Sequence, residues 1–119
     1  PAGFLLISGD DPVTLPMMSL GASGIISVIG NALPKKVATL ARLCTEGKYS
    51  EARPIHNDLL KITDLCFIEG NPAGVKYILQ ELGIGKDILR LPLVPVGGNV
   101  QGAIKEELKK LNKDIAEFG

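Results

Sequence analysis

The sequence predicts an α/β fold in which short parallel strands alternate with helices. Two continuous apolar runs, residues 4–7 and 24–29, are framed by glycines and turn residues, as is typical of strands buried on both faces. A helical pattern follows each run after a connection of a few residues. This order, strand, helix, strand, helix, indicates right-handed βαβ units, in which consecutive strands are parallel.

The first strand is expected at Phe4–Ile7, directly before the turn Ser8-Gly9-Asp10-Asp11. Asp10 or Asp11 can cap the backbone donors of a helix that begins at Pro12, because a proline at the first helical position loses no hydrogen bond. We expect this helix to run to about Leu20 and to end at a glycine.

The second strand is expected over Gly24–Ile29, which is rich in β-branched residues. A second helix should begin at Pro34 and end at Gly47, where a left-handed C-terminal cap fits. Its apolar residues fall at helical spacing on one face: Val37, Leu40, Ala41 and Cys44.

After Gly47 the pattern becomes helical only. Three helices are expected: one capped by Ser50 and ending near Phe67 with a proline in its first turn, one from Asn71 to Gly83, and one from about Asn99 into the charged tail. Residues 91–95 should be extended, because each proline there disfavours helix at the residue before it. We therefore divide the chain into βα units at residues 1–47 and a helical extension at residues 48–119.

Two parallel strands do not make a free-standing sheet, since both faces and both edges need cover. A doubly wound sheet and a closed eight-stranded barrel both fit, and in each the functional loops follow the carboxyl ends of the strands. The chain also begins with Pro1 immediately before a strand, which we interpret as the start of a fragment.

Composition argues against several classes of function. Lys and Arg balance Asp and Glu at 13 each, so nucleic acid is not an expected partner. No apolar run approaches the roughly 20 residues that span a bilayer. The only thiols, Cys44 and Cys66, fit a reduced cytoplasmic setting and buried positions better than a disulfide. His56 stands alone, so no metal site is expected.

Four motifs in register carry a family resemblance. They are Ser8-Gly9-Asp10-Asp11, Gly24-Ile25-Ile26-Ser27-Val28, Glu69-Gly70-Asn71-Pro72 followed by Val75-Lys76, and Leu89-Arg90-Leu91-Pro92-Leu93 with Pro95. In this order and spacing the sequence resembles the last part of the dihydrodipicolinate synthase family of pyruvate-dependent aldolases. The resemblance covers the chain up to its charged tail.

This resemblance implies the C-terminal part of a (β/α)8 TIM barrel: strands seven and eight with their helices, and a C-terminal three-helix extension. In the family, a lysine on the sixth strand forms a Schiff base with pyruvate, and the enamine attacks aspartate semialdehyde in a step of lysine biosynthesis. No other cofactor is needed, and the expected assembly is a homotetramer. The catalytic residues would precede this sequence, so the chain should contain none of them and should be inactive alone.

The resemblance also implies four substrate-binding positions. Ile26 on the eighth strand matches a residue whose main chain contacts pyruvate. Gly9 and Asp10 match the loop after the seventh strand, where a missing Cβ lets backbone approach the site and a carboxylate can bond neighbouring loops. Asn71 matches a polar position near the site entrance.

Two alternatives remain open. The parent protein could be an N-acetylneuraminate lyase or a keto-deoxy-sugar aldolase, although the Asn71-Pro72 and Arg90-Leu91-Pro92 motifs favour the synthase. Alternatively, the chain could be a small noncatalytic α/β interaction domain that folds alone. The loop Ile29-Gly30-Asn31-Ala32 departs from the common family pattern.

Overall fold

The computed structural model describes residues 2–115, with side chains through residue 111. The chain forms two compact units, Pro1–Leu60 and Lys61–Gly119, and each is described by itself. The division falls within helix α3 (Tyr49–Phe67), which contributes its first part to one unit and its last part to the other. The expected division after Gly47, between barrel units and helical extension, stays a prediction.

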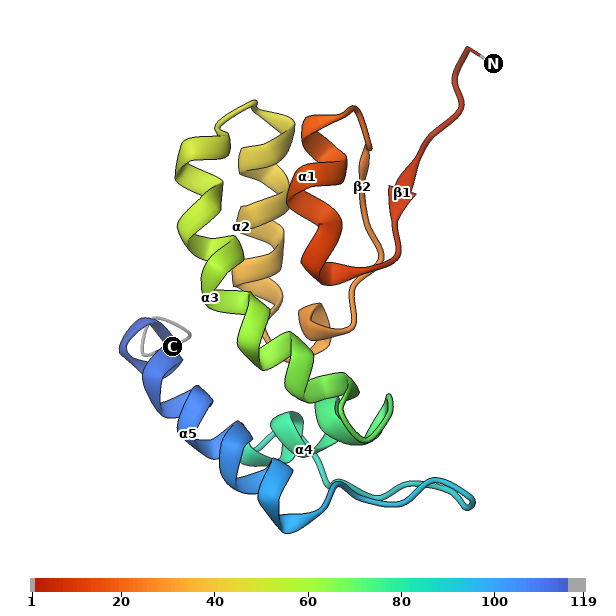
Figure 1. The fold of residues 1–119 in the computed structure, drawn as a ribbon, viewed down its shortest axis with the longest axis vertical. Coiled ribbons are helices and arrows are strands. Elements are labelled where there is room, and N and C mark those ends of the chain that lie inside the picture. Colours follow the sequence, from red (N-terminus) through yellow and green to blue (C-terminus); the bar gives the residue numbers. More distant parts are fainter. Residues whose placement is uncertain (1, 116–119) are drawn as a thin grey trace. The chain divides into compact units, whose positions relative to one another are not determined.

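The first unit contains two parallel strands, β1 (Ile7–Ser8) and β2 (Gly24–Ile25), paired with Ile7 opposite Gly24 and Ser8 opposite Ile25 (Figure 1). This pairing confirms the predicted parallel arrangement. Both strands are shorter than the apolar runs that predicted them, because each has only the other as a partner in the described part of the chain.

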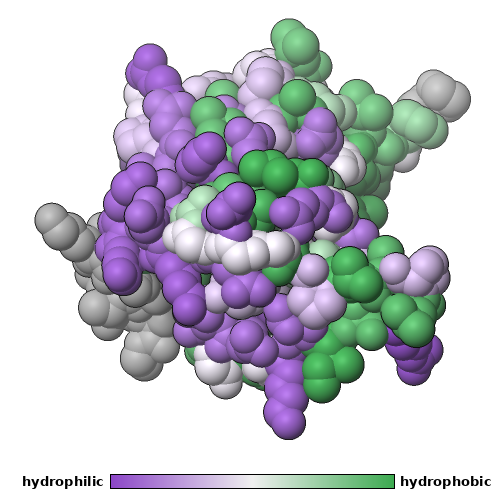
Figure 2. Space-filling model, turned by 60° about the horizontal axis from the view of Figure 1, so that its bottom comes forward, coloured by the Kyte–Doolittle hydropathy of each residue, from purple (hydrophilic) through white to green (hydrophobic). Residues whose placement is uncertain are grey.

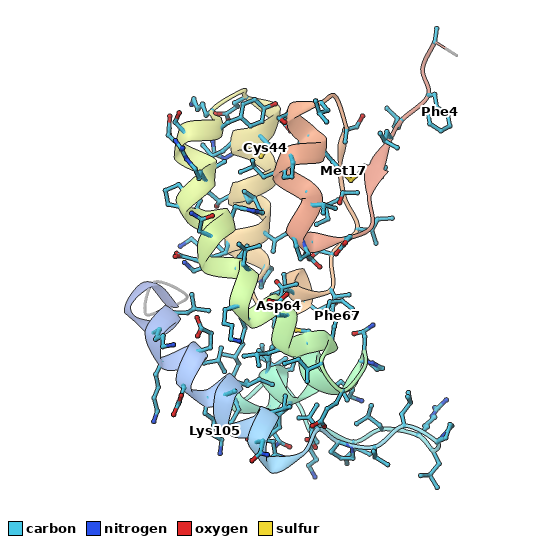
Figure 3. The ribbon with its side chains drawn as sticks, in the orientation of Figure 1. Phe4, Met17, Cys44, Asp64, Phe67 and Lys105 are labelled. Atoms are coloured by element: carbon cyan, nitrogen blue, oxygen red, sulfur yellow. The ribbon has the colours of Figure 1, made fainter. Side chains whose placement is uncertain are left out.

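The apolar run before β1 is exposed, contrary to the predicted burial on both faces. Phe4 is 73% exposed, and it lies on the extended segment away from the helices (Figure 3). A sheet strand is buried only when neighbouring strands and helices cover it, and among the described residues of this unit only one neighbouring strand is present. The residues are strand-like in sequence, but the described chain does not supply the cover that they require.

The helices that follow the strands end close to their predicted C-termini, whereas the first of them begins two residues after the predicted Pro12. After a short 3-10 turn at Asp11–Val13, α1 (Thr14–Ser19) ends before Gly21, whose φ is 108°. Helix α2 (Pro34–Thr45) begins at the predicted proline and is followed by Gly47 at φ 72°. A left-handed φ is readily adopted only by glycine, so both glycines fix where the chain leaves the helix.

The end of the second predicted strand is helical instead. Residues Ile29–Asn31 form a 3-10 turn, and Ile29 is fully buried. The chain therefore leaves the sheet after Ile25, and Ile29 packs inward from a turn. Propensity for strand is overridden here by burial of an apolar side chain.

Helix α3 begins one residue before its predicted cap. The carbonyl of Lys48 accepts the N–H groups of Glu51 and Ala52, so Ser50 lies inside the helix. Pro54 is consequently interior rather than in the first turn. The core of the first unit lies between its helices, where Cys44 is 3% exposed (Figure 3), and the Tyr49 hydroxyl donates to the Met18 carbonyl at 3.2 Å.

The second unit packs the end of α3 against α4 (Ala73–Glu81) and α5 (Gly98–Ile115). Gly74 is the point of closest approach: a Cβ there would lie 2.5 Å from the Cα of Cys66. The buried apolar residues of this unit include Ile62, Leu65, Cys66, Val75, Tyr77, Ile78, Val96, Val100, Ile104, Leu108 and Leu111. The predicted helices are thus confirmed, and the side chains of both cysteines are buried.

An extended loop joins α4 to α5 and exposes apolar side chains. Ile84, Ile88 and Leu91 are each at least 65% exposed, and hydrophobic surface gathers along this loop in Figure 2. The loop is attached to α4 by the Lys76 ammonium, which donates to the Ile88 carbonyl, and by the Asp87 N–H, which donates to Gln80 Oε1 at 3.1 Å. No helix among the described residues is long and apolar enough to cross a membrane.

Candidate functional site

The carboxyl ends of β1 and β2 bring two loops together. Because the strands are parallel and paired in register, Gly9 and Ile26 both follow directly at the same edge of the sheet. The Ile26 N–H donates to the Ser8 carbonyl at 2.9 Å and extends the pairing by one bond. This edge is where the sequence predicted the functional loops.

The turn after β1 is fixed from inside by hydroxyl groups. Ser8 and Thr14 are both fully buried, and their oxygens lie 2.9 Å apart. Each also lies near the carbonyl of Asp10, Ser8 Oγ at 3.0 Å and Thr14 Oγ1 at 3.1 Å. Buried hydroxyls that bond to each other and to backbone hold a turn in one conformation. Asp10 therefore has a well-defined main chain.

Asp11 links the two strand-end loops. One of its carboxylate oxygens accepts the Ser27 hydroxyl, and the other accepts the Val28 N–H at 2.9 Å. Ser27 Oγ in turn accepts the Gly30 N–H at 2.7 Å. The four residues form one connected set of hydrogen bonds that reaches from the loop after β1 to the turn after β2.

The capping prediction for this acidic pair is wrong. Asp10 occupies the position before the 3-10 turn but makes no side-chain cap bond, and the Asp11 carboxylate bonds the neighbouring loop instead. The carboxylate accepts two hydrogen bonds here, from Ser27 and Val28, whereas as a helix cap it would accept only one, from a backbone amide. Tertiary contact thus replaces the local role that the sequence suggested.

Three of the four predicted binding residues meet at the strand ends. Gly9, Asp10 and Ile26 lie there, and the Ile26 side chain is 76% exposed. A Cβ at Gly9 would meet no atom within 4 Å in the described structure, so the close approach expected there is not made within this chain. Asn71 is exposed in the second unit, before a cis bond to Pro72. The binding roles of all four stay predictions.

Sequence reasoning missed Ser8, Asp11 and Ser27 as organisers of this edge. Ser27 did carry a signal, since it is the only polar residue in the run Gly24–Ile29. Its partner could not be identified, because Asp11 lies 16 residues earlier. Only the pairing of the two strands brings these side chains together.

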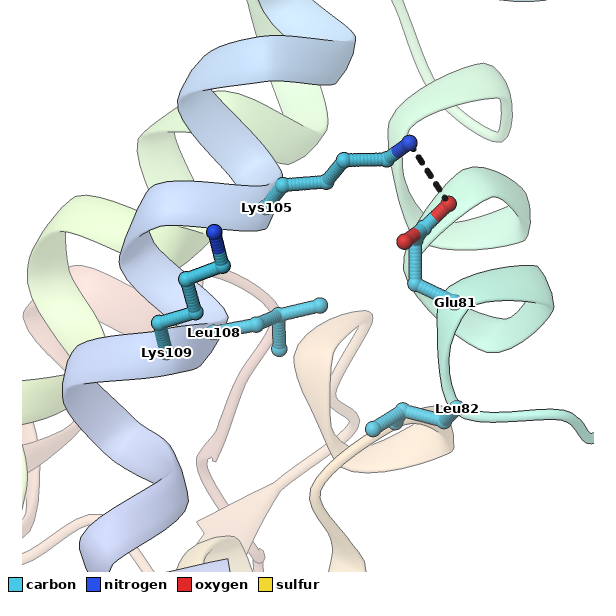
Figure 4. Close-up of a pocket in the computed structure, with 5 residues that line it drawn as sticks. All are labelled: Glu81, Leu82, Lys105, Leu108 and Lys109. Carbon is cyan, nitrogen blue, oxygen red and sulfur yellow. Dashed lines mark ion pairs between the residues drawn. The ribbon is translucent and has the colours of Figure 1, made fainter.

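The second unit contains a pocket of about 190 Å³ on its helical surface, lined by Glu81, Leu82, Lys105, Leu108 and Lys109 (Figure 4). Lys105 pairs with Glu81 at 3.6 Å, and its ammonium lies 6.0 Å from the centre of the Tyr77 ring. Tyr77 itself is buried, and desolvation raises the pKa of its hydroxyl. These contacts join α4 to α5 and explain the pocket as packing between helices. Among the described residues, no cluster of His, Cys, Asp or Glu could hold a metal ion.

Known proteins match this chain along nearly its whole length. The model of the dihydrodipicolinate synthetase family matches residues 1–111. The 4-hydroxy-tetrahydrodipicolinate synthase of Parabacteroides distasonis is 46% identical over 112 residues, which cover 94% of this chain and 38% of that protein. The Phocaeicola vulgatus synthase is 48% identical over 95 residues, covering 80% of this chain and 32% of its own.

Solved structures give the same result. The dihydrodipicolinate synthase from Aquifex aeolicus superposes with a TM-score of 0.89 at 42% identity, over 94% of this chain and 38% of its own. The 4-hydroxy-tetrahydrodipicolinate synthase from Methylacidiphilum fumariolicum SolV superposes with a TM-score of 0.90 at 39% identity. The superposition covers 98% of this chain and 39% of that protein. These relatives are TIM-barrel proteins, and the paired parallel strands fit part of such a barrel. The chain spans 32–39% of the length of these relatives, and it belongs to the dihydrodipicolinate synthetase family.

Proposed function

We propose that this chain is the C-terminal part of a lyase that condenses pyruvate, held as a lysine Schiff base, with aspartate semialdehyde. The product would be 4-hydroxy-tetrahydrodipicolinate, an intermediate of lysine biosynthesis. The family match over residues 1–111 supports this reaction class. The observation that carries the proposal is the parallel pairing of β1 and β2, which puts Gly9 and Ile26 at one sheet edge.

In this proposal, β1 and β2 are strands seven and eight of the barrel. Ile26 would contact pyruvate through its main chain, so its apolar side chain is no obstacle to that role. Gly9 and Asp10 would border the same site, and Asn71 would lie near its entrance. The helices of residues 48–119 would form the extension beside the barrel of a cytoplasmic homotetramer.

The nucleophilic lysine would come from outside this chain. Strands β1 and β2 carry no lysine in the described structure, and the described lysines lie on helices, turns or loops. A Schiff base needs an amine held inside the barrel, where the iminium acts as an electron sink for loss of a methyl proton. Surface lysines on helices do not offer that position.

The exposure of Phe4, Leu5 and Leu6 favours this proposal over a self-sufficient interaction domain. These side chains are 73%, 66% and 52% exposed, whereas an independent domain would bury a continuous apolar run of this kind. Barrel strands on either side would cover them.

Borohydride trapping tests the proposal. The full-length parent enzyme is incubated with pyruvate and sodium borohydride, and its peptides are examined by mass spectrometry. We expect one N6-(1-carboxyethyl)lysine, the product of hydride addition to the pyruvate iminium, located before residue 1, and none in purified Pro1–Gly119 treated in parallel. Samples without pyruvate and samples without borohydride are the controls.

Two results would contradict the proposal. An adduct on a lysine of this chain would overturn the placement of the nucleophile, and no adduct in the parent would overturn the Schiff-base mechanism. A parent that forms the adduct but cleaves N-acetylneuraminate, and does not consume aspartate semialdehyde, would belong to a sugar-acid aldolase instead.

A further inference from the structure

We infer that Asp11 is a positioning residue for pyruvate binding: its carboxylate holds the turn after β2 so that the main chain at Ile26 keeps its orientation toward the substrate. This inference rests on the proposed function. It adds a residue whose side chain acts through the backbone of its neighbour and does not itself touch pyruvate.

Both oxygens of the Asp11 carboxylate are in use. One accepts the Ser27 hydroxyl and the other accepts the Val28 N–H at 2.9 Å. Because one bond goes to a side chain and the other to the main chain of the next residue, the carboxylate fixes both the position and the rotation of this peptide segment. A single hydrogen bond would fix only a distance.

The Ser27 hydroxyl carries the restraint further along the chain. Its proton goes to Asp11, and its oxygen accepts the Gly30 N–H at 2.7 Å. A Cβ at Gly30 would lie 3.0 Å from Ser27 Oγ, so the absent side chain leaves room for this short contact. The turn from Ser27 to Gly30 is thereby tied to the loop after β1.

Ile26 lies between two such anchors and has little packing of its own. Its N–H is held by the Ser8 carbonyl at 2.9 Å, and the next residue, Ser27, is held by Asp11. The Ile26 side chain is 76% exposed, so within this unit hydrogen bonds to the first loop set the course of its backbone. Removing Asp11 would release the anchor on the carboxyl side of Ile26.

An amide cannot replace this carboxylate. An asparagine side chain has the same shape, but only its oxygen accepts, whereas Ser27 and Val28 both donate. If the new amide nitrogen faced Ser27, the hydroxyl would have to accept from both that nitrogen and the Gly30 N–H, and its own proton would lose an acceptor. Asp11→Asn therefore perturbs the link while keeping the volume of the side chain.

The test compares steady-state kinetics of the full-length enzyme and its Asp11→Asn variant. We expect the KM for pyruvate to rise by about 10-fold, the change that follows from weakening roughly one hydrogen bond to the substrate, while the KM for aspartate semialdehyde stays unchanged. A purely structural role would lower the amount of active enzyme or its melting temperature without this selective change in KM.

Asp58→Asn is the matched control. It makes the same chemical change in the same unit, on α3, where the carboxylate pairs with Lys36 at 3.6 Å and is 46% exposed. Its KM for pyruvate should equal that of the unaltered enzyme. Ser27→Ala should raise the KM less than Asp11→Asn, because the bond from Val28 to Asp11 remains, and Ser27→Thr should restore it by returning the hydroxyl.

Each outcome decides the question. An unchanged KM for pyruvate in folded Asp11→Asn, or in Ser27→Ala if the first variant does not fold, overturns the positioning role. The unaltered enzyme is trapped with pyruvate and borohydride in the same series. If the unaltered enzyme forms the adduct, an unchanged KM in the variant contradicts only the role of Asp11. If the unaltered enzyme forms no adduct, the proposed function fails and the inference fails with it.

Discussion

The imidazole of His56 on α3 is partly buried, and this desolvation lowers its pKa below the ordinary value of 6.5. Its charged form is therefore disfavoured in the folded state. Between the lowered pKa and about 6.5, the unfolded chain binds more protons than the folded one, so the free energy of unfolding rises with pH through this window. Above about pH 6.5 the imidazole is neutral in both states and does not lower the free energy of unfolding. On acidification the folded state must bury a charged imidazole, so the free energy of unfolding falls.

We accordingly expect the urea midpoint of the full-length enzyme to fall on acidification below about pH 6.5, and His56→Gln to flatten this part of the curve. Lys48→Gln, which removes an exposed charge of the same unit, should leave the slope in place. Identical slopes in the His56→Gln and unaltered proteins would show that other groups control this pH range.

Single residues also show which parts of the site a sequence can reveal. Gly9 and Asp10 are expected after the first strand, and the structure places them there, whereas Ile26, which the family resemblance assigns within the second strand, directly follows the shorter β2. The Asp11 to Ser27 bond was not foreseeable, since an acidic residue before a proline also fits a helix cap. Local sequence allows both interpretations, and only the packed strands decide between them.

At the scale of elements, the crossing of α3 and α4 depends on Gly74. A Cβ there would lie 2.5 Å from Cys66 Cα and 2.7 Å from its carbonyl oxygen, both backbone atoms that a rotamer change cannot move. We expect Gly74→Ala to lower the free energy of unfolding by about 1–3 kcal/mol, because the helices must separate.

Gly102→Ala on α5 is the matched comparison. No atom lies within 4 Å of a Cβ at that position, so alanine should instead stabilise the helix by about 0.5–1 kcal/mol. Urea unfolding of the two full-length variants measures both changes. If the two substitutions change the free energy of unfolding equally, the helices at Gly74 accommodate the added Cβ without loss of stability, which would contradict the prediction.

Helix ends were more predictable than strands because their signals are local. Gly21, Gly47 and Gly83 all adopt positive φ close to the predicted helix ends, and Pro34 opens α2 as expected. Strand length depends instead on partners distant in sequence, so β1 is two residues long where an apolar run of four was expected. The turn at Ile29–Asn31, where Ile29 is fully buried, likewise depends on tertiary packing.

At the scale of the whole molecule, the described chain presents an uncovered sheet edge and an exposed apolar segment at Phe4–Ile7. Such edges pair with other chains, and exposed apolar surface binds hydrophobic dyes. We expect purified Pro1–Gly119 to self-associate and to bind anilinonaphthalene sulfonate, measured by sedimentation velocity and by fluorescence. Replacing both Phe4 and Leu6 with lysine should reduce both signals.

Leu20→Lys serves as the comparison for added charge. Leu20 is 88% exposed but follows α1 and lies outside the sheet, so its replacement should have a smaller effect. A monomer that binds no dye and unfolds cooperatively would contradict the expectation and favour an independent domain.

The open edge of the two-stranded sheet has a practical consequence for reconstitution. Under the proposed function, the preceding segment of the parent enzyme would end in a strand that pairs with the open edge of β1, even when that segment is produced as a separate polypeptide. Co-expression of the two fragments would then give a split enzyme. Recovery of activity would show that the fragments have associated through this edge.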